Sequence, residues 1–74
     1  MMVKGAIEKK LAEYEDLVKQ VKATKMGLKA LEPLEEEIGK LLKEYLKNAK
    51  DDADFEFIAE TTNRIVEAKR RLYN

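Results

Sequence analysis

The stretch that decides the fold is IEKKLAEYEDLVKQVKATKMGL, residues 7–28. Within it, seven positions step by four and three residues in turn, and six of the seven are apolar. This spacing places the side chains on one face of an α-helix. Because Leu17 and Leu31 widen the stripe, it is typical of a bundle helix and predicts a first helix over residues 3–31. The seven positions are Ile7, Leu11, Tyr14, Val18, Val21, Lys25 and Leu28.

Pro33, the only proline, marks the first expected boundary. Proline lacks the N–H group that an interior helical position uses, but it suits the first position of a helix. The three glutamates at residues 35–37 would then lie in a first helical turn, where negative charge is favourable. We therefore expect the chain to reverse at Pro33 and a second helix to cover residues 33–49. The alternative is one long helix over residues 3–50 that is kinked at Pro33.

The segment NAKDDAD, residues 48–54, separates this helix from a third. Asn and Asp side chains hydrogen-bond the local backbone and compete with a helical ladder. Steps of three and four then resume and predict a helix over residues 53–73. No segment alternates as a strand would, so the fold class is all-α. We expect a single domain over residues 1–74, an antiparallel three-helix bundle or a kinked helical hairpin. The third stripe contains Phe55, Ile58, Thr62, Ile65, Lys69 and Leu72.

The composition excludes most enzyme chemistry. The chain has no cysteine, histidine or serine, which removes disulfides, thiolate and imidazole catalysis, serine nucleophiles and nearly every zinc site. Asp52, Asp54 and Glu56 have the spacing of the first ligands of a calcium loop, but Phe57 stands where that loop needs glycine. We therefore expect a protein that is not an enzyme and that binds neither a metal nor a cofactor.

The net charge is zero, but the charges are unevenly distributed along the chain. Residues 1–31 carry seven lysines and four acids, residues 32–60 four lysines and ten acids, and residues 61–74 four basic residues and one acid. The segments therefore carry +3, −6 and +3, which suits an acidic helix packed beside two basic ones. The candidate partner-binding residues are cations of the basic segments and one aromatic residue: Tyr14, Lys22, Lys25, Lys29, Arg64, Arg70 and Arg71.

Broad apolar stripes with charged borders are typical of helices that bind other helices. The leading hypothesis is thus a non-enzymatic protein–protein interaction module, an adapter, inhibitor or small regulator that presents a helix face to a protein partner. The alternative is a nucleic-acid-binding regulator that uses the basic residues of the first and third helices. The two hypotheses differ in whether those basic residues must converge on one face.

No apolar run is long enough for a transmembrane helix or a secretion signal, so we expect a cytoplasmic protein with no membrane partner. We also expect self-association. A first helix of about 29 residues would exceed a second helix of about 17 residues by about 18 Å. The overhang would leave Ile7, Leu11 and Tyr14 uncovered, and this favours a symmetric homodimer that shares one bundle.

Overall fold

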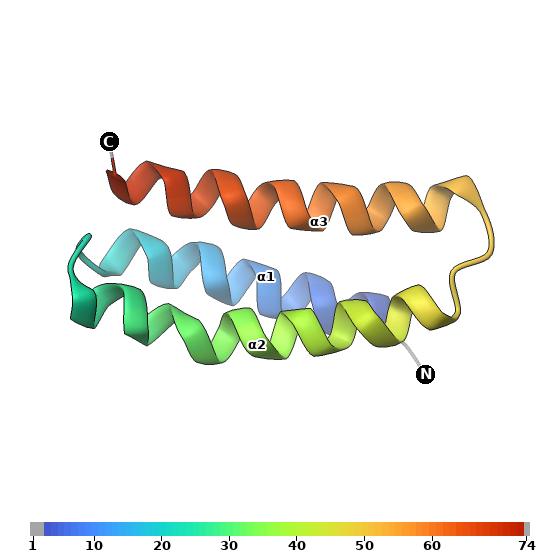
Figure 1. The fold of residues 1–74 in the computed structure, drawn as a ribbon, viewed down its shortest axis with the longest axis horizontal. Helices are drawn as coiled ribbons and strands as arrows, with labels where there is room; N and C mark the ends of the chain where they lie inside the picture. The colour runs from blue at the N-terminus through green and yellow to red at the C-terminus, as the bar shows by residue number, and fades with distance from the viewer. Residues whose placement is uncertain (1–2, 74) are drawn as a thin grey trace.

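The computed structural model describes residues 3–73 as three helices in an up-down-up arrangement (Figure 1). Helix α1 spans Val3–Gln20, α2 spans Lys25–Lys47 and α3 spans Asp52–Arg70, followed by a 3-10 turn, η1, over Arg71–Tyr73. The prediction of an all-α antiparallel three-helix bundle is confirmed. Of the domain expected over residues 1–74, Met1, Met2 and Asn74 lie outside the described residues.

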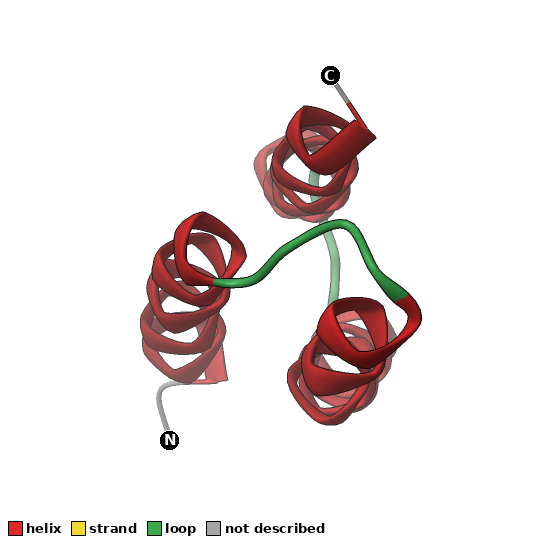
Figure 2. Ribbon diagram, turned by 90° about the vertical axis from the view of Figure 1, so that its left-hand side faces the viewer, coloured by secondary structure: helices red, strands yellow, loops and turns green. Residues whose placement is uncertain are grey.

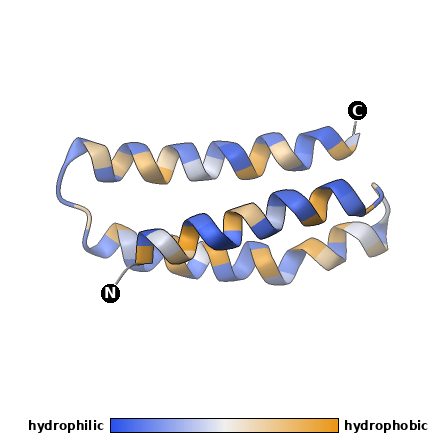
Figure 3. Cartoon of the chain, turned by 180° about the vertical axis from the view of Figure 1, so that it is seen from behind, coloured by the Kyte–Doolittle hydropathy of each residue, from blue (hydrophilic) through white to orange (hydrophobic). Residues whose placement is uncertain are grey.

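Seen end-on, the three helices occupy the corners of a triangle (Figure 2). Hydrophobic residues recur along each helix between hydrophilic ones (Figure 3), as expected when each helix buries one stripe. Helices α1 and α2 pack together most extensively, and α2 and α3 contact each other least. The central cluster of buried side chains draws on all three helices and contains Tyr14, Val18, Leu31, Ile38 and Ala68; Ile7 and Leu11 are also buried.

The first predicted boundary is wrong. Helix α1 ends at Gln20 rather than at residue 31, and the chain reverses over residues 21–24 rather than at Pro33. Thr24 begins the next helix as its N-cap, because its side-chain oxygen accepts a hydrogen bond of 3.1 Å from the Gly27 N–H. A threonine in this role supplies a partner to one of the unpaired N–H groups at a helix start. Thr24 was the signal in the sequence, and the continuing heptad spacing concealed it.

Gly27 is buried against the turn that precedes it. A Cβ at this position would collide with the main-chain carbonyl of Lys22. Because backbone atoms cannot move aside as a flexible side chain can, the tight turn requires glycine here. Gly39, in the same helix, differs, since a Cβ there would meet no atom within 4 Å. The two glycines therefore have different structural roles.

Pro33 lies inside α2, exposed to solvent, rather than at a helix start. A second helix beginning at residue 33 and one long helix over residues 3–50 are therefore both wrong. The missing N–H of Pro33 deprives the Lys29 carbonyl of its helical partner, and the exposed position leaves that carbonyl accessible to water. Helices α1, α2 and α3 contain 18, 23 and 19 residues. The overhang from which we expected a homodimer does not exist, because the helices have similar lengths.

The third helix lies close to its predicted range, and its N-terminus is held by hydrogen bonds to acidic side chains. Asp51 is the N-cap and accepts a hydrogen bond of 3.1 Å from the Asp54 N–H. Asp54 in turn accepts hydrogen bonds from the Tyr45 hydroxyl at 2.7 Å and the Lys50 N–H at 3.0 Å. These contacts anchor the start of α3 to the end of α2.

The buried face of α3 is rotated relative to the predicted stripe. Thr61 and Ala68 are buried, whereas Thr62 is exposed and bonds its hydroxyl to the Ile58 carbonyl at 2.9 Å. Phe55, the first residue of the predicted stripe, is 50% exposed. The apolar surface of α3 is therefore wider than the face that packs on α1 and α2.

Two alanine substitutions should act in opposite directions on stability. Gly27→Ala should lower the free energy of unfolding by about 1–3 kcal/mol, because the new Cβ displaces the turn. Gly39→Ala should raise it by about 0.5–1 kcal/mol, because alanine favours an unobstructed helix interior. Urea denaturation followed by circular dichroism measures both. Equal effects for the two variants would contradict the assigned position of the turn.

At low pH, protonation of Asp54 should weaken the hydrogen bonds that hold the start of α3. Hydrogen bonds from the Lys50 N–H and the Tyr45 hydroxyl lower the pKa of Asp54 below its ordinary value of 3.8. A carboxyl group whose pKa is lower in the folded than in the unfolded protein stabilises the fold at pH values above its unfolded-state pKa. This contribution is lost as the pH falls through the folded-state pKa. Asp54→Asn should therefore lower the melting temperature more at about pH 7 than at about pH 2.5. An equal decrease at both pH values would contradict this assignment.

Candidate functional site

The up-down-up order brings the end of α1, the start of α2 and the end of α3 to one end of the bundle, the end that faces the viewer in Figure 2. Basic residues lie on each of these segments. Lys19 and Lys22 lie at or just beyond the end of α1, and Lys25 and Lys29 lie in the first turns of α2. Arg70 is the last residue of α3, and Arg71 is the first residue of η1. Cations that are distant in sequence thus share one end of the molecule.

At this end an open groove of about 740 Å³ separates α1 from α3. Its lining combines apolar side chains from both helices with four cations and two carboxylates. We call it the α1–α3 groove. The lining residues are Glu15, Val18, Lys19, Val21, Lys22, Ala23, Asn63, Arg64, Glu67, Ala68, Arg71 and Leu72.

Two of the charges in the α1–α3 groove neutralise each other. Arg64 donates from Nε and Nη2 to the two carboxylate oxygens of Glu15, at 3.1 and 2.6 Å. This paired geometry raises the pKa of Arg64 and fixes the guanidinium against α1. Glu67 lies 3.5 Å from Arg70, which is outside the lining. Within residues 3–73, no carboxylate lies within 4.0 Å of the cationic groups of the other three lining cations, Lys19, Lys22 and Arg71.

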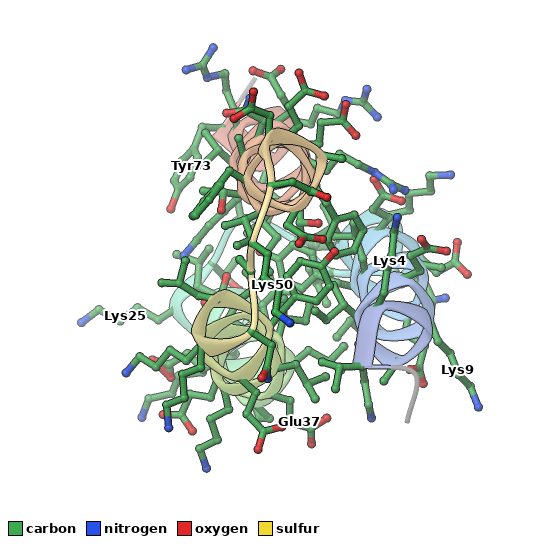
Figure 4. All side chains as sticks on the ribbon, turned by 90° about the vertical axis from the view of Figure 1, so that its right-hand side faces the viewer. Lys4, Lys9, Lys25, Glu37, Lys50 and Tyr73 are labelled. Carbon is green, nitrogen blue, oxygen red and sulfur yellow. The ribbon has the colours of Figure 1, made fainter. Side chains whose placement is uncertain are left out.

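The structure brings together three of the seven predicted site residues, since Lys22, Arg64 and Arg71 line the α1–α3 groove. Lys25 and Lys29 are exposed on α2 but do not line it. In Figure 4 the side chain of Lys25 extends from α2 on the side away from α1. The apolar floor was not predicted as a site, because Val18 and Leu72 have the helical spacing of core residues.

Tyr14 is fully buried and lies in the core rather than on a surface that a partner could contact. Its hydroxyl donates a 2.6 Å hydrogen bond to Glu35 of α2, and the Lys69 ammonium of α3 lies 3.3 Å from the same carboxylate oxygen. Burial, and then the bond to Glu35, raise the pKa of Tyr14. The three side chains connect all three helices through one carboxylate.

Over residues 3–73, no group of three or more acidic side chains is arranged to hold a metal ion. None of the described helices has the length and apolar character of a membrane span. Comparison with models of known protein families, with curated proteins and with solved structures finds no match to this chain. The groove and the charges around it are therefore the features of the molecule that indicate a function.

The Tyr14 hydroxyl should contribute measurably to stability. Tyr14→Phe removes a hydrogen bond to a carboxylate, and such bonds contribute about 1.5–3 kcal/mol. We expect the substitution to lower the free energy of unfolding, measured by urea denaturation, by an amount within this range. Tyr73→Phe is the matched control, because Tyr73 is 63% exposed. Similar values for the two variants would show that the buried hydroxyl does not connect the helices as described.

Proposed function

We propose that this protein is a non-enzymatic interaction module that binds an acidic amphipathic helix of a partner protein in the α1–α3 groove. One observation carries the proposal: an apolar floor shared by two helices lies beneath cations that have no carboxylate partner in the described chain. The interaction module expected from the sequence thereby gains a defined surface and a defined partner chemistry.

The shape of the groove suits a helix. Helices α1 and α3 lie side by side, and the groove at their ends has the buried Val18 and Ala68 at its base and the half-buried Val21 and Leu72 beside them. A partner helix with apolar residues at i, i+3, i+4 and i+7 could place that stripe between the two, as in helix-in-groove recognition. The bound helix would then occupy the position of a fourth helix in a bundle.

The charge of the groove suits an acidic partner. Four basic and two acidic side chains line it, a net charge of +2. Because Arg64 is already paired with Glu15, the cations available to a partner are Lys19, Lys22 and Arg71. Glutamate or aspartate residues bordering the apolar stripe of the partner would meet them at the rim, where charges favour association and orientation more than affinity.

Nucleic-acid binding is the second candidate, favoured by the convergence of Lys22, Arg64 and Arg71 on one groove. Phosphate groups would gain nothing from the apolar floor, and the two lining carboxylates would repel them. About three phosphate contacts would give a log–log salt slope near −2.7, a loss of about 40-fold in affinity between 50 and 200 mM salt. Such a salt dependence would distinguish nucleic-acid binding from the binding of a partner helix.

The test uses a synthetic helical peptide with a leucine stripe bordered by glutamates, labelled for fluorescence anisotropy. We expect saturable binding to the full chain and no binding of a peptide with the same composition in scrambled order. Lys22→Glu with Arg71→Glu should weaken binding at least tenfold, because like charges then face the peptide. Lys9→Glu with Lys43→Glu makes the same change in net charge on exposed positions outside the groove and should leave binding unchanged.

A labelled random DNA duplex and single strand, measured at low and moderate salt, complete the design. No peptide binding, or equal effects of the two charge-reversed variants, would contradict the proposed function. DNA binding that falls steeply with salt and is lost in the groove variant would favour the second candidate. Peptide binding without DNA binding is the result we expect.

A further inference from the structure

A second surface, on the side of the bundle formed by α2 and α3, has no role in the proposed function. Three large apolar side chains, Phe55 and Val66 of α3 and Tyr73 of the η1 turn that follows it, are 50%, 48% and 63% exposed. Their spacing places them on one stripe of the helix, and Figure 4 shows Tyr73 on the side of α3 that faces away from α1. Leu46 of α2 is 51% exposed. We call this surface the α2–α3 face.

A shallow groove of about 410 Å³ runs along the α2–α3 face. Leu42 of α2 and Ile65 and Val66 of α3 line it, and Gly39 contributes no side chain where a Cβ would meet open space. These two helices also contact each other least among the three pairs. The α2–α3 face therefore offers apolar area that the single chain does not cover.

The charges along α3 indicate what covers this face. Residues 52–60 carry four acidic side chains and no basic one, whereas residues 61–71 carry four basic side chains and one acidic. The halves therefore carry −4 and +3. Two of the basic side chains, Arg64 and Arg71, line the α1–α3 groove, which leaves Lys69 and Arg70 as the cations of this half on the rest of the helix. Two copies of α3 packed in opposite directions place the acidic half of each against the basic half of the other, and this pairing is favourable at both ends. Packed in the same direction, like charges would meet.

The charges along helix α2 also differ between its two halves. Its residues 25–36 carry two basic and three acidic side chains, and its residues 37–47 carry three basic and two acidic. The resulting charges of −1 and +1 also favour an antiparallel partner. A two-fold axis that turns α3 against α3 turns α2 against α2 as well, so one symmetry operation satisfies both helices. A self-complementary surface is what a two-fold dimer requires.

We propose that this protein forms a symmetric homodimer through the α2–α3 face, with the two copies of α3 antiparallel. The apolar stripe of α3 and Leu42 of α2 form the centre of the interface, and the oppositely charged halves of α3 flank it. The apolar residues at the centre of this interface do not line the α1–α3 groove, so the dimer can form whether or not that groove binds a partner.

The first experiment measures mass by light scattering on a gel-filtration peak, with the full chain at about 100 µM. We expect twice the chain mass of 8.6 kDa. Val66→Glu places a charge in the interface and should raise the dimer dissociation constant at least tenfold, with its helical circular dichroism retained. Ala12→Glu, on an exposed position of α1, is the matched control and should remain dimeric. A wild-type chain of 8.6 kDa, or dissociation of the Ala12→Glu variant alone, would overturn the proposal.

The second experiment tests the antiparallel direction by charge reversal. One variant carries Asp52→Lys and Glu56→Lys, and the other carries Arg70→Glu, because Arg71 lines the α1–α3 groove. Each places like charges where the oppositely charged ends of the two α3 helices would meet, so each alone should dimerise at least tenfold more weakly than the wild type. An equimolar mixture should recover a dimer, because the two variants complement each other. Dimers that are unaffected by either reversal would overturn the antiparallel pairing. Circular dichroism confirms in each case that the helices remain folded.

Discussion

The close approach of Gly27 to the Lys22 carbonyl is the constraint on which the rest of the structure depends. It permits the chain to turn within four residues, and Thr24 then caps the new helix. Because the turn comes this early, α2 is long enough to run back along α1 and to carry Glu35 to the level of Tyr14. A turn at Pro33 would not place Glu35 beside Tyr14. One position without a side chain therefore determines the register between the first two helices.

The side-chain contacts of Glu35 also fix the register between the helices. A carboxylate partly shielded from water is costly unless it is paired and hydrogen-bonded, and here Tyr14 and Lys69 satisfy it from two other helices. Sliding any helix by one turn would separate at least one of these partners from the carboxylate. Apolar packing alone tolerates such shifts more readily, because it has little directionality. The bundle thus combines a nondirectional core with one directional contact that selects a single alignment.

The amphipathic pattern predicted that the chain is all-α and where α3 lies, since strong apolar periodicity with an Asp-rich boundary leaves few alternatives. It misplaced the first turn, because Val21, Lys25 and Leu28 continue the heptad spacing across a break that only Thr24 and Gly27 signal. It also assigned Tyr14 to a partner surface, because periodicity cannot distinguish a buried side chain from one at an interface. Lys22, Arg64 and Arg71 were predicted as candidates, but their meeting in one groove depends on tertiary packing that no local pattern encodes.

The order of the helices also bears on how the chain reaches its fold. Most packing occurs between α1 and α2, which are neighbours in sequence and are separated by a very short connection. Their contacts grow outward from this short connection, so the first of them close small loops and lose little entropy. Topologies dominated by such local contacts have low contact order and fold within about microseconds to milliseconds. We therefore expect the helical hairpin of α1 and α2 to form first, and α3 to complete the bundle through its contacts with α1.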